Sequence, residues 1–228
     1  MKIGVLLPTF RDVTSDALAA ARLAADAGLD GVFAYDHLWP MGRPDRPSFA
    51  PFPVLARVAL ENPSLIVGPL VARIGLVSPA ALIEQFRTLA AVAPTRVVAP
   101  LGTGDKLSEA ENIAYGVPPA TPAVRREDLR RVAESLIEEM DVWIGAGAAA
   151  TNEIAREVGA TLNVWNKRAE VVAELGEAGP VNWAGNATDD LHTQLDTLSA
   201  AGATWAVFSP TVDVVHLGAW RERPATSK

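Results

Sequence analysis

Eight short apolar runs, separated by amphipathic segments, predict a (β/α)8 barrel, the TIM-barrel fold. The chain has 228 residues, close to the usual length for that fold. Its composition, 49% hydrophobic and 21% charged, is that of a globular protein with one large core. We therefore expect a barrel rather than an open doubly wound sheet, with residues 1–215 forming a single domain and residues 216–228 a C-terminal tail.

The first half of the chain contains four of the expected strands, each a short apolar run. These strands are residues 3–7, 31–35, 64–71 and 96–101. The first helix should run to Ala27, with Thr14 or Ser15 as its N-cap and Gly28 at its end. The next helices are expected within residues 52–60 and after the pair Ser78-Pro79, which suits an N-cap and a first helical position.

The second half repeats the pattern. The expected strands are residues 142–144, 161–165, 181–184 and 204–208. One amphipathic helix carries apolar residues between Leu129 and Met140, and another follows the turn at residues 145–151. Two further helices are expected at residues 167–175 and between an Asn186 cap and Gly202. The tail should hold one short helix.

Composition and charge exclude several classes of function. The net charge of −7, without any lysine or arginine run, argues against nucleic acid or an anionic membrane as partner. No apolar run is long enough for a signal peptide core or a membrane span, so we expect a cytoplasmic protein. Without cysteine there is no disulfide or thiolate nucleophile, and the three histidines lack metal-ligand spacing. No metal is expected.

Polar side chains follow the second expected strand directly. Residues 31–35 lead without a gap into Asp36, His37 and Trp39. Because ligands bind at the carboxyl ends of parallel strands, Asp36 and His37 fall where chemistry is expected. In the alternative interpretation Asp36 caps a turn and His37 is a solvated loop residue.

A proline-rich segment, residues 40–47, follows this pair and cannot form a helix or a strand. It predicts a long surface loop at the same end of the barrel. The loop is either a connector or a lid in which Arg43 and Arg46 offer charge to an anionic ligand.

Two glycine-rich turns end the fourth and fifth expected strands. Gly102-Thr103-Gly104-Asp105 allows a sharp turn near Asp36 and His37. The second turn, which begins at Gly145, leads into a helix, whose free N–H groups and dipole suit a phosphate. A plain tight turn is the alternative there, because the dinucleotide fingerprint is incomplete.

Five of these motifs, in their order along the chain, resemble the bacterial luciferase-like superfamily. They are residues 3–8, 27–39, 68–71, 101–105 and 144–147. Members are (β/α)8 barrels that bind FMN or the deazaflavin coenzyme F420. The Asp-His pair, the Gly-Thr-Gly-acid turn and residues 162–165 are more similar to the deazaflavin-dependent oxidoreductases than to the oxygen-using monooxygenases.

The resemblance implies catalytic roles for three residues. His37 would lie near the reactive C5 of the deazaflavin and polarise it or shuttle a proton, and Trp39 would shape the substrate side. Asp105 stands where related dehydrogenases often carry a proton-donating Glu, and Ser108 where they often carry an amide that contacts the coenzyme. Both positions depart from the family pattern.

The resemblance also implies how the coenzyme is held. Gly147 and Ala148, with Trp165, would surround its phosphate, and a cis peptide at Leu70-Val71 would support the back of the ring. The implied cofactor-binding residues are Asp36, His37, Leu70, Val71, Gly102, Thr103, Ser108, Gly145, Gly147, Ala148 and Trp165. The chain lacks room for the segments that usually close over the substrate, so an open pocket is expected.

The function implied is hydride transfer between F420 and a small organic substrate. A deazaflavin carries the hydride, so the protein needs only to hold the reactants and place a proton donor or acceptor nearby. One alternative is an FMN-dependent monooxygenase; another is a non-catalytic flavin- or deazaflavin-binding protein. A barrel of unrelated function is the remaining alternative. The apolar outer helices and the family habit suggest a homodimer.

Overall fold

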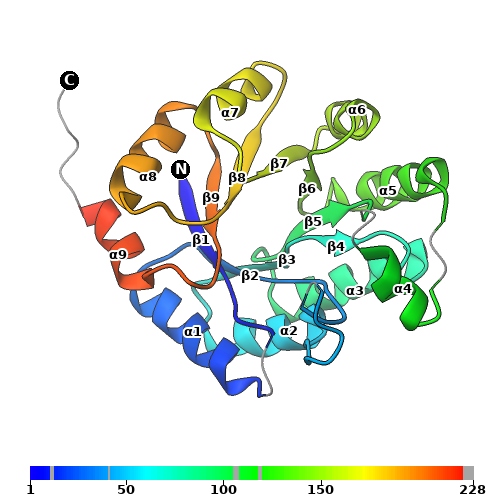
Figure 1. Cartoon of the computed structure of the whole chain (residues 1–228), viewed down its shortest axis with the longest axis horizontal. Coiled ribbons are helices and arrows are strands. Elements are labelled where there is room, and N and C mark those ends of the chain that lie inside the picture. The colour runs from blue at the N-terminus through cyan, green and yellow to red at the C-terminus, as the bar shows by residue number, and fades with distance from the viewer. Residues whose placement is uncertain (11–12, 41, 105–107, 118–119, 223–228) are drawn as a thin grey trace.

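The structure is a computed structural model that describes residues 1–10, 13–40, 42–104, 108–117 and 120–222 (Figure 1). In this described part, nine parallel strands form one sheet in the order β3-β2-β1-β9-β8-β7-β6-β5-β4. The sheet curls until its ends meet, where Val67 bridges to Val97 in parallel. Helices surround the strands on the outside (Figure 1). The arrangement confirms the predicted barrel.

The strands follow the expected apolar runs closely. Their bounds are β1 (Lys2–Leu6), β2 (Gly31–Ala34), β3 (Ile66–Pro69), β4 (Ala72–Arg73), β5 (Val98–Gly102), β6 (Asp141–Gly145), β7 (Thr161–Trp165), β8 (Val181–Gly185) and β9 (Trp205–Phe208). β3 lies within the expected third strand, residues 64–71, whereas β4 begins one residue beyond it. Together β3 and β4 occupy one strand position of an eight-stranded barrel. Between them lies a cis peptide at Leu70-Val71, as the resemblance implied.

Apart from α4, which the sequence did not predict, the α-helices lie in or near the expected segments. They are α1 (Ser15–Asp26), α2 (Pro51–Glu61), α3 (Pro79–Val92), α4 (Glu109–Ala114), α5 (Pro122–Leu136), α6 (Ala149–Val158), α7 (Ala169–Gly176), α8 (Leu191–Ala200), α9 (Val214–Ala219) and the 3-10 helix η2 (Trp220–Glu222). Ser78 caps α3 as predicted, because its hydroxyl accepts a hydrogen bond from Ala81 N at 3.3 Å.

One expected cap is in place and another is wrong. Thr14 is the N-cap residue of α1 as predicted, although its side chain makes no capping hydrogen bond. Asp190, not Asn186, caps α8, because its carboxylate accepts the Thr193 amide at 3.0 Å. Asn186 lies too far before the helix, and its backbone amide donates a hydrogen bond to Asn166 Oδ1.

Two apolar layers hold the barrel together. The larger lies between the strands and the helices, and the smaller fills the barrel interior. In the interior, the rings of Phe33, Trp143 and Trp205 contact one another with centroids 5.2 to 5.6 Å apart. Because these rings occupy the interior near the amino ends of the strands, space for a ligand remains at the carboxyl ends.

α9 spans residue 215, the expected boundary between barrel and tail. Leu217 is fully buried, and Gly218 lies so close to Ala27 that an added Cβ would be 2.2 Å from its carbonyl oxygen. Arg221 pairs with Asp30. Residues 216–221 therefore pack against the barrel.

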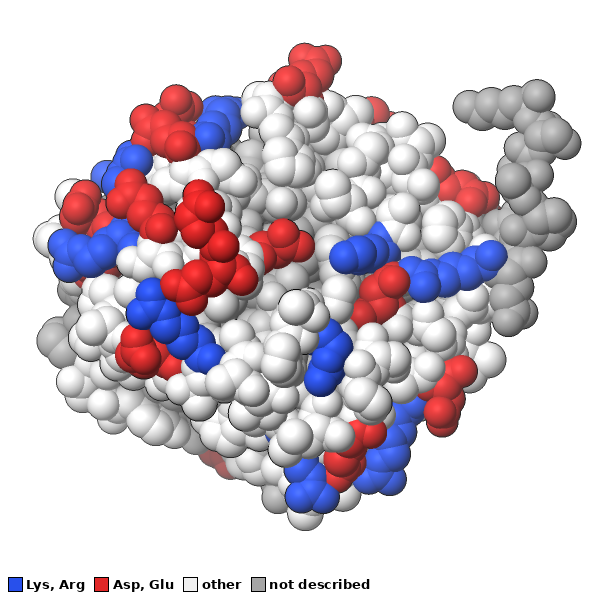
Figure 2. Space-filling view, turned by 180° about the vertical axis from the view of Figure 1, so that it is seen from behind, with Lys and Arg blue, Asp and Glu red and all other residues white. Residues whose placement is uncertain are grey.

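Surface charges are largely paired. Figure 2 shows acidic and basic side chains lying close together in several groups on one face. Arg87 bonds Glu139 at 2.7 Å, and Arg57 bonds Glu61 at 2.5 Å. Within the described residues, no helix combines the length and apolar character that crossing a membrane requires.

Candidate active site

A cavity of about 720 Å³ opens at the carboxyl ends of strands β2 to β7. Its volume lies in the range of sites for cofactors and drug-sized ligands. The predicted site residues that line it are Asp36, His37, Leu70, Val71, Gly102, Thr103, Ser108, Gly145, Gly147, Ala148 and Trp165. The barrel therefore brings together residues that lie far apart in the sequence, from Asp36 to Trp165.

One predicted residue that the structure describes, Trp39, is not among those lining the cavity. Trp39 packs instead against Tyr115, with the ring centroids 5.6 Å apart. Asp105 lies outside the described residues. Their assigned roles stay predictions.

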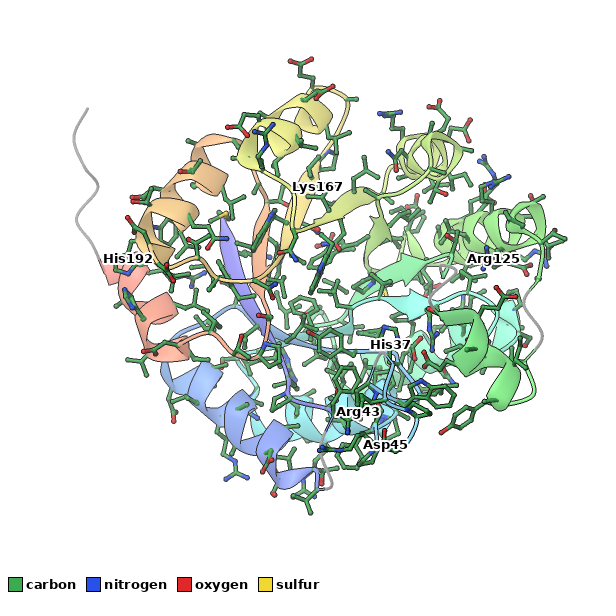
Figure 3. The ribbon with its side chains drawn as sticks, viewed as in Figure 1. His37, Arg43, Asp45, Arg125, Lys167 and His192 are labelled. Atoms are coloured by element: carbon green, nitrogen blue, oxygen red, sulfur yellow. The ribbon has the colours of Figure 1, made fainter. Side chains whose placement is uncertain are left out.

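His37 lies at the end of β2, on the side of the barrel where α4 packs (Figure 3). Its Nδ1 is 3.0 Å from the carboxylate oxygen Oε2 of Glu111. Because an ionised carboxylate can only accept a hydrogen bond, Nδ1 carries the proton in this pair. No described residue bonds to the other ring nitrogen, Nε2, which leaves it for a ligand.

A buried ion pair fixes Glu111 in place. Arg73 directs both terminal nitrogens at its carboxylate, with distances of 2.8 and 3.3 Å. The side chain of Arg73 is 5% exposed and that of Glu111 is 3% exposed. The backbone amide of Leu38 donates to the same carboxylate. The carboxylate that holds His37 is therefore itself held from two other sides.

The same contacts set the charge of Glu111. Burial alone would raise its pKa, but hydrogen bonds from His37 and Leu38 and the charge of Arg73 outweigh burial and lower the pKa below its ordinary value. Glu111 is thus an anion at neutral pH, as the pairing with Nδ1 requires.

Asp36 has the opposite electrostatic character. Its carboxylate accepts the Arg73 amide at 2.7 Å, and its carbonyl oxygen accepts Arg73 Nε at 2.9 Å. Burial nevertheless raises the pKa of Asp36 to about 7, against the opposing hydrogen bond and charge of Arg73. Near neutral pH this carboxyl can either donate or accept a proton, which suits acid–base chemistry.

The start of α6 forms a second functional region of the cavity. The helix begins after Ala148, which has no side chain to cap it, so its first amides are open to a ligand. A Cβ added at Gly147 would meet no atom within 4 Å. Gly147 N donates to Asn152 Oδ1 at 3.0 Å, which holds the turn in shape. This region can bind an anion by its amides and helix dipole.

Comparison with known proteins identifies the family. The family model described as luciferase-like monooxygenase matches residues 1–142, which is more than half of the chain. The chain belongs to the luciferase-like monooxygenase family.

Two curated proteins are similar to this luciferase-like chain. An F420-dependent hydroxymycolic acid dehydrogenase of Mycobacterium tuberculosis is 30% identical over 156 residues, 68% of this chain and 41% of that protein. An F420-dependent glucose-6-phosphate dehydrogenase of Nakamurella multipartita is 28% identical over 159 residues, 69% of this chain and 44% of that protein. The chain spans about two fifths of the length of these curated relatives.

A solved structure shares the fold of this luciferase-like barrel. An F420-dependent secondary alcohol dehydrogenase, in complex with an F420-acetone adduct, superimposes with a TM-score of 0.77. The match covers 95% of each chain at 13% sequence identity. At that identity the likeness demonstrates a common architecture.

Sequence reasoning missed three polar residues of this luciferase-like site. Arg73 ends the interrupted third strand, and an arginine at the carboxyl end of a strand was the available signal. Glu111 lies on α4, a helix of six residues that the apolar pattern did not indicate. Asn163 of β7 lines the cavity and donates to Asn182 Oδ1 on β8. Its signal was a polar residue alternating with apolar neighbours in a strand.

Proposed function

We propose that the protein is an oxidoreductase that transfers a hydride between coenzyme F420 and a small organic substrate. The observation that carries the proposal is the His37–Glu111 pair beside a cavity that also contains the uncapped start of α6. The names of the two curated relatives, both F420-dependent dehydrogenases, support the choice of coenzyme.

The residues of the cavity fit such a coenzyme. Gly147 leaves open space beside the amides of α6, which would hold its phosphate. Leu70, Val71 and Gly102 would line the flat ring, and Ser108 and Thr103 would offer hydroxyl groups to it. When bound, the deazaflavin supplies the carbon that accepts or donates the hydride.

His37 moves the proton that accompanies the hydride. Oxidation of an alcohol releases a proton from its oxygen, and Nε2 of His37 is the unpaired base that can receive it. Glu111 keeps the proton on Nδ1 and holds the ring in one orientation. In the reduction direction His37 returns a proton to the same oxygen.

Asp36 is the second ionisable group at the site. Because burial raises its pKa to about 7, it can hydrogen-bond the polar edge of the ring either as donor or as acceptor. Asp105 is proposed as a further acid, and Trp39 as a residue of the substrate side, on the resemblance alone.

The test is a binding titration of F420 and FMN, followed by alcohols, sugar phosphates, imines and enones with the tighter coenzyme. We expect tight F420 binding and turnover with at least one substrate, measured by the change in absorbance of oxidised F420. The description of the matching family favours one alternative, an FMN-dependent monooxygenase. Tight binding of reduced FMN with oxygen consumption would select that alternative. Binding without turnover on any substrate would indicate a coenzyme-binding protein.

A further inference from the structure

Two arginines of α5, Arg125 and Arg126, line the cavity without a carboxylate partner among the described residues. Most other described arginines pair with a carboxylate, as Arg73 does with Glu111 and Arg130 with Glu157. The protein as a whole is acidic, with a net charge of −7. Two unpaired guanidinium groups at one cavity are therefore a local exception that requires an explanation.

Their position on the helix makes a purely structural role less favourable. α5 begins at Pro122, so both arginines lie within about a turn of its positive end. No acidic residue lies in that first turn to compensate them. A cation there is opposed by the helix dipole, whereas an anion bound between them would be favoured by it.

Arg125 also carries a buried donor without an acceptor. Its Nε is shielded from solvent and has no hydrogen-bond partner in the described structure. Buried polar groups in native proteins are nearly always paired with protein, water or ligand. One terminal nitrogen of Arg125 lies 3.9 Å from the point that a Cβ of Gly104 would occupy, at the end of β5. This guanidinium therefore lies at the turn that borders the cavity (Figure 3).

We propose that Arg125 and Arg126 form a second anion subsite, which binds a carboxylate or phosphate group other than the one held at the start of α6. The two sets of donors lie on different elements. The arginines lie on α5, which follows β5, and the uncapped amides lie at the start of α6, which follows β6.

The oxyanion has two chemical sources, and the identification of either rests on the proposed function. F420 carries glutamate carboxylates beyond its phosphodiester. The substrate is the other source, if it bears a phosphate or carboxylate. Both sources offer carboxylate or phosphate groups, and a guanidinium group binds two oxygens of such a group with two parallel hydrogen bonds.

The test compares the double variant Arg125→Gln/Arg126→Gln with Arg131→Gln. Arg131 lies on the same helix, is 59% exposed and pairs with Asp128 at the surface, so it is a matched control. Dissociation constants are measured by fluorescence for F420, for FMN, and for the deazaflavin that lacks phosphate and glutamates. Inorganic pyrophosphate is titrated calorimetrically into the F420-bound protein and into the unliganded protein.

If the coenzyme supplies the anion, the double variant should bind F420 at least about tenfold more weakly, with FMN and the phosphate-free deazaflavin unchanged. If the substrate supplies it, F420 binding should be unchanged and pyrophosphate should bind the F420-bound double variant at least about tenfold more weakly. Arg131→Gln should match the wild type in both cases.

Equal losses for FMN and F420 would overturn the proposal, because the arginines would then hold the phosphate itself. Unchanged binding of every probe would also overturn it. If the wild type binds neither F420 nor FMN, the proposed function fails, yet pyrophosphate still tests the subsite in the unliganded protein. In the unliganded protein, a loss of pyrophosphate affinity of about tenfold in the double variant, but not in Arg131→Gln, supports the subsite. Equal pyrophosphate affinity in all three proteins rejects it.

Discussion

His37 combines a fixed ring orientation with a nitrogen that faces the cavity. Replacing it with Ala removes the proposed proton carrier but few coenzyme contacts. We expect His37→Ala to lower turnover by about 10²-fold or more, with the F420 dissociation constant changed little. Steady-state kinetics and a binding titration check this. His192, whose ring packs against His216 far from the cavity (Figure 3), is the matched control. Normal turnover in His37→Ala would remove His37 from the mechanism.

The ion pair between Arg73 and Glu111 should matter for folding as well as chemistry. Glu111→Ala leaves the buried guanidinium of Arg73 without its carboxylate, which typically costs about 3–5 kcal/mol of the free energy of unfolding. Glu139→Ala, which breaks the exposed pair with Arg87, should lower the free energy of unfolding far less, because solvent screens that pair. Urea unfolding measures both. If Glu111→Ala and Glu139→Ala lowered the free energy of unfolding equally, burial of the Arg73–Glu111 pair would have no energetic consequence.

Asp36 makes stability depend on pH. Its pKa is about 7 in the folded chain, whereas an unfolded aspartate titrates near about 3.9. The folded state therefore holds the proton more tightly, and the stability that Asp36 contributes is present below about pH 4 and lost as the pH rises through 7. Asp36→Asn removes this dependence. The wild type should lose stability relative to Asp36→Asn as the pH rises from 4 to 8. Urea unfolding of both proteins at each pH measures this difference. A constant difference would contradict the raised pKa.

At this scale the sequence predicted residues that follow strands and missed those that depend on distant partners. Asp36 and His37 were found because the switch from apolar to polar residues marks a strand end. Glu111 lies 74 positions after His37, and their contact depends on how α4 packs on the barrel. A pairing across that separation leaves no periodic signal in the chain.

Among the elements, α6 offers the sharpest test. Because a Cβ at Gly147 meets nothing within 4 Å, the fold should tolerate a side chain there. Gly147→Glu places bulk and negative charge at the proposed phosphate position, so coenzyme binding should be lost while the melting temperature stays close to that of the wild type. Gly176→Glu on α7 is the control, because space is equally open there and Gly176 does not line the candidate active-site cavity. A Gly147→Glu protein that binds F420 normally would place the phosphate elsewhere.

The elements themselves were largely predictable because buried strands and amphipathic helices repeat at different periods. The exceptions are informative. α4 has only six residues, too few to display a helical period. The cap of α8 was misassigned because both Asn186 and Asp190 are good capping residues, and only the three-dimensional path decides between them.

For the whole molecule, the remaining question is assembly. Leu23 on α1 is 45% exposed and Leu60 on α2 is 67% exposed, and these two helices contact each other. Large apolar side chains exposed on adjacent helices suit a subunit interface. One chain has a mass of 24.1 kDa, and we expect light scattering to give twice that mass for the wild type. Leu60→Asp should shift the measured mass toward that of a single chain. A wild-type mass of 24.1 kDa would exclude the homodimer.

The barrel as a whole was predictable from alternation alone, because only a few architectures bury strands on both faces. Gly68 and Pro69 pair with β2 in regular register, and the strand is interrupted directly after them. The signal for that interruption is Pro69, which has no amide to donate to a ladder. The shape of the cavity was not predictable in the same way. It depends on which strand ends carry large side chains, on where α4 and α5 cover the rim, and hence on contacts throughout the molecule.

The described residues that line the cavity are Phe10, residues at the ends of β2 to β7 and in the segments that follow them, and residues at the starts of α5 and α6. None of them belongs to the loops at residues 186–190 and 209–213. Those two loops stand at the same end of the barrel, after β8 and β9. We therefore expect that they can be lengthened or exchanged without loss of the proposed proton carrier or of the proposed anion sites. For protein engineering, this side of the rim is the place to graft a substrate-recognition loop, and in evolution it is where new specificity could arise at the smallest cost to the existing chemistry.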